Sequence, residues 1–588
     1  MLRFLSQFIA SLLAFLVVLF VIIPGLVVWL VASEIKPLPD TMVLTLDLRR
    51  PIPDKSDLSL FGRSGPDATS VVGIVRALEQ AERDPRVRGV YLQIGDSGLS
   101  LAAAQELREA LGHFKDAGKS VFAHTQSLFS AGLGAYSLAA AADNFSLQPG
   151  GILFTSGLST NTLFFKSAFE RIGVQPSFRG YGEYKSGINP YLEDDYPDTM
   201  REARTALLTS TYEQAVTDLA DMRGIAASEL KDLFSDAPVL ADRALSLNLV
   251  DAVRHEAEAR QEARKAGGAD ARLVTMKAYL RDPFNTRDRE GATTVALVHA
   301  SGAIVEGGGN DGGIPDADEV GADVFSRAIA RAVSSPRIKA LILRVDSPGG
   351  SPLASEQIRH ALLEAQAAGK PVIVSMAGVA ASGGYWISMS ADRILAHPAT
   401  VTGSIGVYGG KFAIGETLNK LGITFGELAS NDGALLLSPK TPFDDDQWAR
   451  FDRYLLSVYD DFIAKGSEGR DLSPEVFEQH ARGRVWSGVD ALERNLIDRH
   501  GGLRTAMAEV RETLNLSETA PLVLRDYPAK PGLADLIAAL MSASAGAVRA
   551  GQVLDEVMTL VPADARRKVS AVLGSDDPVV YEETGPIR

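Results

Sequence analysis

The sequence predicts an α/β fold, with two tandem domains of one architecture that follow an N-terminal transmembrane helix. Three observations support this class. Residues 8–32 form an uncharged apolar stretch, short β-branched runs alternate with helical segments over most of the remaining chain, and this alternating pattern occurs twice. Alternation of strand and helix is typical of a parallel sheet covered by helices.

Composition limits the class of function. The chain has 588 residues, so more than one packed core is expected. Its net charge of -15 opposes binding to polyanions, and we expect no nucleic-acid partner. It contains no cysteine, which excludes disulfides and thiolate chemistry, and its eight histidines are scattered without ligand-like spacing. We therefore expect neither a metal site nor a cofactor.

Residues 8–32 (FIASLLAFLVVLFVIIPGLVVWLVA) are the predicted membrane anchor. At about 1.5 Å per residue, such a helix can cross a hydrocarbon core of roughly 30 Å. A cleaved signal peptide is the alternative, but the stretch is long for one and the following LVASEIK offers no A-x-A cleavage site. Arg3 precedes the span, and Glu34, Lys36 and Asp40 follow it. These charges favour a cytoplasmic N-terminus, residues 1–7, with the body of the protein on the other side.

The first domain is expected over residues 40–260 and the second over 292–515. A polar linker at 261–291 joins them, and a helical extension and tail follow at 516–588. The strands MVLTLD (42–47) and TVALVH (294–299) open the two domains. Each is followed by a helix, a buried strand (GVYLQIGDS or ALILRVDSP), a helix that ends in AGK, and another strand (SVFAH or PVIVS).

A constant offset relates the two domains. Subtracting 249 from the residue number (383 − 134 = 249) superposes identical residues without a gap, which indicates a tandem duplication. The matching pairs are Gly383/Gly134, Tyr385/Tyr136, Ala391/Ala142, Asp392/Asp143, Pro398/Pro149, Gly406/Gly157 and Gly422/Gly173. Repeats of this length indicate two packed domains rather than a solenoid.

The copies differ at positions that could do chemistry. Ser382 corresponds to Leu133 at the same offset, so the first copy lacks that hydroxyl. Lys185 corresponds to Ala434, so the second copy lacks that amine. Each copy has kept one of two residues that could work together. This pattern predicts a single composite site between the domains.

Ser382 is the candidate nucleophile. It lies in VAASGGYWISMSAD (379–392), after a strand and at the start of a predicted helix. Small neighbours let a substrate backbone approach, and helix N–H groups face developing negative charge. In DSPGGS (346–351), Gly349 and Gly350 are candidate oxyanion donors, since Pro348 has no N–H. A helix-capping serine and an ordinary tight turn are the alternatives.

Lys185, in GEYKSG (182–187), is the candidate base. An exposed lysine has a pKa of about 10.4 and is a poor base at neutral pH. It would serve only if burial, few carboxylates and a hydroxyl partner kept it neutral. A seam between two apolar-faced domains could bury it, and Ser404, in TGSIG (402–406), is the candidate partner. A solvated surface lysine is the alternative.

The segments ASGGYWIS, DSPGGS, TGSIGV and GEYKSG resemble, in order and spacing, the long, tandem-duplicated, membrane-bound form of bacterial signal peptide peptidase (SppA-like). The resemblance runs from the anchor to about residue 525. It implies ClpP/crotonase-like domains and a Ser–Lys dyad. By motif, the family's nucleophile, general base, lysine-orienting hydroxyl and oxyanion glycines match Ser382, Lys185, Ser404, and Gly349, Gly350 and Gly383.

The resemblance further implies a membrane-anchored serine endopeptidase that hydrolyses remnant signal peptides and other hydrophobic peptides. It implies a homo-oligomer, a tetramer, placed in the bacterial inner membrane as a single-pass protein with its catalytic body in the periplasm. Two other interpretations stay open. A catalytically inactive membrane scaffold could keep the fold. A crotonase-type acyl-CoA enzyme uses similar glycine-rich loops, but it would need neither the anchor nor Lys185.

Overall fold

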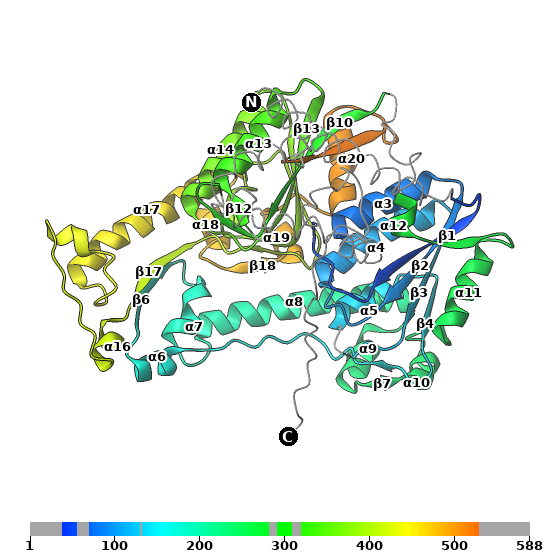
Figure 1. Cartoon of the computed structure of the whole chain (residues 1–588), viewed down its shortest axis with the longest axis horizontal. Helices are drawn as coiled ribbons and strands as arrows, with labels where there is room; N and C mark the ends of the chain where they lie inside the picture. The colour runs from blue at the N-terminus through cyan, green and yellow to red at the C-terminus, as the bar shows by residue number, and fades with distance from the viewer. Residues whose placement is uncertain (1–37, 56–69, 130–131, 281–290, 309–318, 529–588) are drawn as a thin grey trace, which may run out of the picture. The chain divides into compact units, whose positions relative to one another are not determined.

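The computed structural model describes residues 38–55, 70–129, 132–280, 291–308 and 319–528 (Figure 1). Within these ranges, the first half of the chain forms a six-stranded parallel sheet in the spatial order β8-β4-β3-β2-β1-β9. Its strands are β1 (Met42–Leu48), β2 (Val87–Ile94), β3 (Ser120–Thr125), β4 (Asn144–Leu147), β8 (Ala252–Val253) and β9 (Arg272–Thr275). Their nearly continuous apolar runs fit a parallel sheet that helices cover.

The second half of the chain repeats this arrangement around a larger sheet. Its described strands follow the order β18-β16-β14-β13-β10-β20, with β15 beside β14 and β19 beside β15. They are β10 (Thr293–Ser301), β13 (Ile338–Ser347), β14 (Val372–Ala381), β15 (Arg393–Ala396), β16 (Val401–Gly403), β18 (Val485–Ser487), β19 (Arg499–His500) and β20 (Leu522–Tyr527). The neighbours β14-β13-β10-β20 repeat the order β3-β2-β1-β9. The predicted tandem α/β fold is therefore confirmed.

Helices follow most strands in both halves. In the first half they are α3 (Val71–Arg83), α4 (Leu101–Asp116), α5 (Gly132–Ala140), α6 (Lys166–Ile172), α7 (Asn189–Leu192), α8 (Asp198–Arg223), α9 (Ala227–Ser235), α10 (Ala241–Ser246), α11 (Glu256–Ala266) and α12 (Met276–Leu280). In the second half they are α13 (Ala322–Ser334), α14 (Pro352–Ala367), α15 (Gly383–Trp386), α16 (Gly415–Lys420), α17 (Asp445–Gly469), α18 (Pro474–His480), α19 (Gly488–Glu493) and α20 (Leu503–Thr513).

Matching hydrogen bonds confirm the duplication at the level of side chains. The hydroxyl of Tyr136 donates to the carbonyl of Leu249 at 3.0 Å, and that of Tyr385 donates to Leu496 at 3.0 Å. Both tyrosines are fully buried, so each hydroxyl needs such an acceptor. At the ends of the two long helices, Arg223 pairs with Asp251 at 2.9 Å and Arg470 pairs with Asp498 at 2.6 Å.

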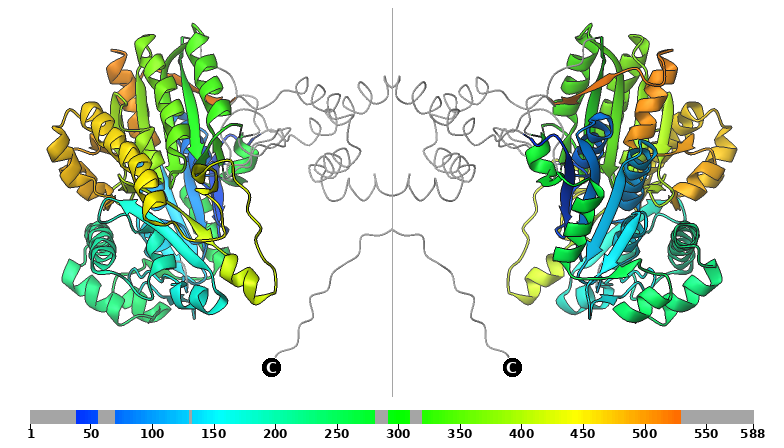
Figure 2. Two further views of the ribbon diagram at one scale, coloured as in Figure 1. Left: turned by 90° about the vertical axis from the view of Figure 1, so that its left-hand side faces the viewer. Right: turned by 90° about the vertical axis from the view of Figure 1, so that its right-hand side faces the viewer.

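One of the apolar cores extends across both halves. In the second sheet, side chains alternate between faces. Val298 and Leu343 face a cluster with α13 and α14, whereas Leu297 and Ile342 belong to the core of the first half. Helix α20 contributes Leu503, Ala506, Met507 and Val510 to that same core and contacts α3, α4, β13 and β14. The side views of Figure 2 show the strands of this half lined by helices.

A short antiparallel ribbon also joins the halves. Strand β6 (Gln175–Tyr181) comes from the first half and β17 (Val407–Ala413) from the second, with Tyr181 opposite Val407. Figure 1 shows the two strands side by side, with α8 running from this region towards the first sheet. Helix α8 packs against α5 and α9 of its own half and against β18 of the other. The ribbon and α8 thus tie together segments that are distant in sequence.

Two sheet strands lie outside the predicted domains. Strand β9 falls in the predicted linker at 261–291 and pairs in parallel with β1. Strand β20 falls in the predicted extension at 516–588 and pairs in parallel with β10. Further short elements are β5 (Ile152–Leu153), β7 (Val239–Leu240), β11 (Ala303–Val305), β12 (Glu319–Gly321), and the 3₁₀ helices η2 (Ser186–Ile188) and η4 (Asp432–Leu435). The domain boundaries stay a prediction.

The predicted localisation requires correction. None of the helices in the described ranges combines the length and apolar composition needed to cross a bilayer. The stretch at 8–32, on which a single-pass inner-membrane protein with a periplasmic body was predicted, lies outside the described residues. That localisation is therefore not supported, because a spanning helix needs about 20 predominantly apolar residues.

Candidate active site

Ser382 occupies a sharp turn between a strand and a helix. Strand β14 ends at Ala381 and α15 begins at Gly383, which matches the local structure predicted from the sequence. The backbone of Ser382 has φ 55° and ψ -117°, a region that residues with a Cβ rarely adopt. Strain of this kind also marks the turn that exposes the nucleophile in α/β-hydrolases. The turn leaves the serine side chain half-buried.

Lys185 comes from the other half of the chain, in the loop between strand β6 and η2. Its side-chain nitrogen lies 3.0 Å from Ser382 Oγ. The same nitrogen donates to the carbonyl oxygen of Ser404 at 2.6 Å and lies 3.0 Å from Ser404 Oγ. The structure therefore brings together the three residues that the sequence had singled out, within hydrogen-bond distance of one amine.

The surroundings of Lys185 favour its neutral form. The residue is only 8% exposed, and burial lowers its pKa from the ordinary lysine value to about 7. Within the described part of the chain, no carboxylate forms an ion pair with this amine; its partners are the uncharged oxygens of Ser382 and Ser404. No ion pair with a carboxylate of the described residues offsets the desolvation, so the amine can accept a proton near neutral pH.

The position of Ser404 follows from strand pairing. Gly403 and Ser404 both have positive φ, 79° and 52°, so the chain turns sharply after β16. The carbonyl of Gly403 accepts from the N–H of Ser382 at 2.9 Å, and the N–H of Ser404 donates to the carbonyl of Arg484 at 2.7 Å. Ser404 is thus held between the strand that leads to Ser382 and strand β18. That backbone arrangement directs both of its oxygens at Lys185.

The candidate oxyanion glycines lie against the Ser382 turn. A Cβ added to Gly349, where φ is 103°, would lie 2.5 Å from the nitrogen of Gly383, and one added to Gly383 would lie 3.0 Å from the nitrogen of Gly350. The N–H of Gly349 donates to Ser347 Oγ at 3.1 Å. No acceptor within the described ranges takes the N–H of Gly350 or Gly383. These two are therefore the N–H groups available to a ligand.

Backbone hydrogen bonds to strand β11 hold the segment that contains Gly349 and Gly350. Ile304 donates its N–H to the carbonyl of Gly349 at 2.9 Å and accepts from the N–H of Ser351 at 2.8 Å. A Cβ on Gly350 would lie 2.0 Å from the carbonyl oxygen of Ile304, so only glycine fits there. These hydrogen bonds involve the residues before and after Gly350, so the N–H of Gly350 itself is directed away from β11.

The corresponding positions in the other copy have no matching chemistry. Leu133 lies buried in α5, and Ala434 lies in η4. The counterpart of ribbon strand β6 in the second half, residues 424–430, forms no strand. Only one set of candidate residues therefore occurs in the described chain.

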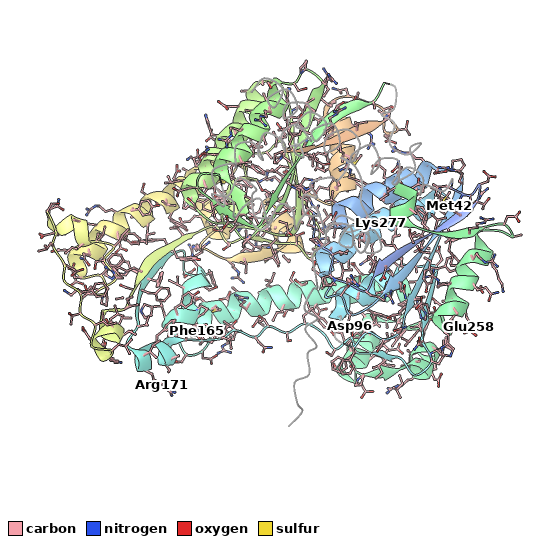
Figure 3. All side chains as sticks on the ribbon, viewed as in Figure 1. Met42, Asp96, Phe165, Arg171, Glu258 and Lys277 are labelled. Atoms are coloured by element: carbon pink, nitrogen blue, oxygen red, sulfur yellow. The ribbon has the colours of Figure 1, made fainter. Side chains whose placement is uncertain are left out.

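An aromatic cluster supports the ribbon that presents Lys185. Its ring centroids lie 4.9 to 6.3 Å apart, and its members come from α6 and the residue that precedes it, β6, α7 and β17. They are Phe165, Phe169, Phe178, Tyr191 and Phe412. Figure 3 labels Phe165 in this region, well separated from Asp96 at the end of β2. Such packing stiffens the two strands that flank the site.

Sequence reasoning missed Gly483 and Arg484, which precede β18 and lie against the Lys185 loop. A signal was present. At the offset of 247 that aligns Asn495 with Asn248, these two residues correspond to Asp236 and Ala237, so the copies differ here as well. The comparison that singled out Ser382 and Lys185 would have found them if it had been extended to this segment.

Comparison with known proteins places both halves of the chain in one family. Residues 113–270 and 364–517 each match Peptidase family S49. The chain therefore belongs to that family of peptidases. It is also 29% identical over 529 residues to a chloroplastic serine protease SPPA of Arabidopsis thaliana, covering 88% of this chain and 76% of the relative, which supports a protease of the serine class.

Individual relatives extend over most of the chain. It is 30% identical to Protease 4 of Salmonella typhi over 590 residues, covering 95% of this chain and 91% of the relative. It is 32% identical to Protease 4 of Haemophilus influenzae over 472 residues, covering 78% and 75%. A putative signal peptide peptidase SppA of Enterococcus faecium is 28% identical over 233 residues, which are 39% of this chain and 67% of the relative.

Proposed function

We propose that this protein is a serine endopeptidase in which Ser382 is the nucleophile and Lys185 the general base. The observation that carries the proposal is the short contact between the lysine amine and the serine hydroxyl, combined with the lowered pKa of a buried lysine. A neutral amine has two N–H groups and one lone pair. Ser404 offers two acceptors, and the Ser382 hydroxyl can donate to the lone pair.

The reaction proceeds by acyl transfer in two steps. Lys185 takes the proton from Ser382 Oγ, which bonds to the scissile carbonyl carbon while the C=O electron pair moves to oxygen. The C–N bond then breaks, and the lysine ammonium returns the proton to the leaving amine. In the second step Lys185 deprotonates water, which attacks the acyl group, and the proton passes back to Ser382 as it leaves.

We propose the N–H groups of Gly350 and Gly383 as the oxyanion donors. Their freedom from other acceptors supports this assignment, and Gly349 supports them through its backbone turn. Two fixed donors aimed at the developing oxyanion lower the barrier without reorganisation.

We propose hydrophobic peptides, including remnant signal peptides, as substrates. The relative from Enterococcus faecium bears the name of a signal peptide peptidase, which supports this class. Two quenched fluorescent peptides of equal length, one with a leucine- and alanine-rich core and one with a serine- and glutamine-rich core, test it. The apolar peptide should have a kcat/KM at least about tenfold higher. Equal values would contradict the substrate class and leave the chemistry intact.

A homo-oligomer, a tetramer by family resemblance, is also proposed. Exposed apolar side chains at Ile172, Phe412 and Leu421, near the β6–β17 ribbon, support a contact with another subunit. Light scattering of the purified full-length protein would give the subunit number, and a monomer at micromolar concentration would contradict the proposal.

The two alternative interpretations are less well supported. An inactive scaffold would not need a buried amine without a counter-ion, which costs stability. A crotonase-type acyl-CoA enzyme has no role for Lys185, and membership of a peptidase family disfavours it.

Labelling with a serine-reactive fluorophosphonate tests the proposed chemistry. We expect one label per chain, on Ser382, and none in Ser382→Ala. Lys185→Ala should slow labelling by about 10² to 10⁴-fold, the usual contribution of a general base. Ser334→Ala, an exposed serine at the end of α13, is the matched control. Undiminished labelling of Ser382→Ala would contradict the assignment of Ser382 as the nucleophile. Full activity of Lys185→Ala would contradict the assignment of Lys185 as the general base.

A further inference from the structure

The loop before β18 lies directly against the loop that carries Lys185. Tyr184 donates its N–H to the carbonyl of Arg482 at 2.8 Å, and Gly483 donates to the carbonyl of Ile405 at 2.7 Å. Arg482 and Gly483 both have positive φ, 48° and 76°. This left-handed pair turns the second half of the chain back onto the loop from the first half.

Gly483 makes the closest approach. A Cβ at this position would lie 2.5 Å from the backbone nitrogen of Lys185 and 2.6 Å from its Cβ. Such distances cannot be relieved by a side-chain rotation, because the atoms belong to the backbone and the first side-chain carbon. The loop is thus seated on Lys185 itself.

Arg484 adds a side-chain clamp between the halves. Its guanidinium lies 4.8 Å from the ring of Tyr184, in the first half, and 4.6 Å from the ring of Trp486, in the second. One of its nitrogens donates to Glu202 of α8 at 2.7 Å, and the other carboxylate oxygen of Glu202 accepts from the hydroxyl of Tyr184 at 3.2 Å. A planar cation suits both the stacking and the ion pair.

The same residue also holds Ser404, whose N–H donates to the carbonyl of Arg484 at 2.7 Å. The backbone of Arg484 therefore fixes the acceptor of the lysine amine, while its side chain fixes the residue before the lysine. We propose that Arg484 is a positioning residue that sets the distance between the amine of Lys185 and Ser382 by joining the Tyr184–Lys185 loop to strand β18. The inference rests on the proposed Ser–Lys chemistry.

The clamp acts through position rather than through charge. Among the described residues, the charged side chains paired across the Lys185 loop are Glu183 with Arg482, and Glu202 of α8 with Arg484. Burial alone accounts for the lowered pKa of Lys185, without a contribution from these groups. A loosened loop would admit water, so the amine would be both displaced and better solvated.

The test compares Arg484→Met with Arg484→Lys and with the control Arg494→Met. Arg494 stacks on the same Trp486 ring at 3.9 Å, but it hydrogen-bonds to Asp490 and Glu493 in its own half. Each full-length variant is assayed for kcat and KM on an apolar fluorescent peptide from pH 5 to 10, after circular dichroism shows a native fold.

For Arg484→Met we expect kcat to fall by roughly tenfold to hundredfold, as for a misplacement of about 1 Å, with little change in KM. The pH midpoint of kcat/KM should rise from about 7 towards the ordinary lysine value of about 10.4. Arg484→Lys, which keeps the ion pair without the planar stacking, should recover part of the rate, and Arg494→Met should leave the midpoint unchanged. The effects of Arg484→Met and Tyr184→Leu should not add, because both remove the same clamp.

A wild-type midpoint and rate in a folded Arg484→Met would overturn the inference, as would equal losses in Arg494→Met. If Arg484→Met does not fold, kcat and the pH midpoint of kcat/KM are measured for Arg484→Lys and Glu202→Gln instead, and wild-type values in both would overturn the inference. Lys185→Ala, assayed alongside, distinguishes a failure of the proposed Ser–Lys chemistry from a failure of the Arg484 inference. Full activity in that variant overturns the Ser–Lys chemistry itself, whereas its inactivity beside an unaffected Arg484→Met overturns the clamp alone.

Discussion

Lys185 and Ser382 are 197 residues apart in the chain, and the lysine Nζ lies 3.0 Å from the serine Oγ. The lysine follows a strand of the first copy, and the serine follows a strand of the second. Neither copy has both residues, since Leu133 and Ala434 occupy the matching positions. The two copies of the duplication thus differ at both positions, and the proposed Ser–Lys pair forms only where the halves meet.

The pH dependence of activity should follow the ionisation of Lys185. Its pKa is lowered to about 7 by burial, and only the neutral amine can accept the serine proton. We expect kcat/KM to fall about tenfold per pH unit below 7 and to level off above 8. A steady-state profile from pH 5 to 10 measures this. A midpoint near that of an ordinary lysine would contradict the buried, neutral amine.

Lys185 should cost the protein stability near neutral pH. Between about pH 7 and 10.4 the unfolded chain binds a proton that the native lysine has released, so stability rises with pH across this window. The penalty at pH 7 is on the order of 4 kcal/mol, offset in part by hydrogen bonds worth about 1 kcal/mol each.

Lys185→Met should therefore raise the free energy of unfolding at pH 7 by roughly 1–3 kcal/mol, although it abolishes catalysis. The gain should shrink at pH 10. Urea unfolding at the two pH values measures both. Lys231→Met, which removes a surface ion pair with Glu213, is the control, and its effect should be similar at both pH values. A loss of stability in Lys185→Met at pH 7 would argue against the desolvated amine.

Gly383→Ala should block the proposed oxyanion site. The added methyl group would lie 3.0 Å from the nitrogen of Gly350 and 2.6 Å from Ser355 Oγ. We expect kcat to drop by about 10² to 10³-fold, the usual effect of losing an oxyanion donor, with a smaller change in KM. Gly112→Ala, in helix α4 with open space around it, is the control and should be fully active. An active Gly383→Ala would require a different pair of donors.

A buried ion cluster should matter for holding the halves together. Arg344 of β13, only 1% exposed, pairs with Asp54 at 2.6 Å and with Glu106 of α4 at 2.8 Å, both from the first half. Burial would raise the pKa of Glu106, but the neighbouring Arg344 and His397 outweigh it and hold the pKa well below its usual range. The carboxylate therefore stays charged and needs its partner.

Arg344→Met should lower the free energy of unfolding by roughly 3–5 kcal/mol, because it removes the guanidinium that pairs with the buried carboxylates of Asp54 and Glu106. Arg243→Met, which breaks the exposed pair with Asp236, should cost less than about 1 kcal/mol. Chemical denaturation of both variants gives the comparison. Equal losses of stability in the two variants would show that burial does not increase the contribution of this ion cluster to the free energy of unfolding.

Much of the fold could be predicted because it depends on local patterns. Apolar runs at 42–47 and 294–299 became β1 and β10, since strands buried on both faces need such runs. The constant offset predicted the duplication, and the paired hydrogen bonds of Tyr136 and Tyr385 repeat it. The strand–serine–helix order around Ser382 was readable for the same reason. The predicted inner-membrane localisation was wrong by contrast, since no described helix can span a bilayer.

By itself, then, the sequence determined the α/β class, the tandem repeat and which residue each copy had lost. Only the tertiary structure decided that Lys185 is buried and that Ser404 offers it two oxygens. It also decided that Gly483 and Arg484 pack against the loop that carries Lys185. These properties depend on segments far apart in the chain, which the β6–β17 ribbon and the loop before β18 bring together. The pKa of a buried amine is set by everything that surrounds it, and a local pattern cannot contain that information.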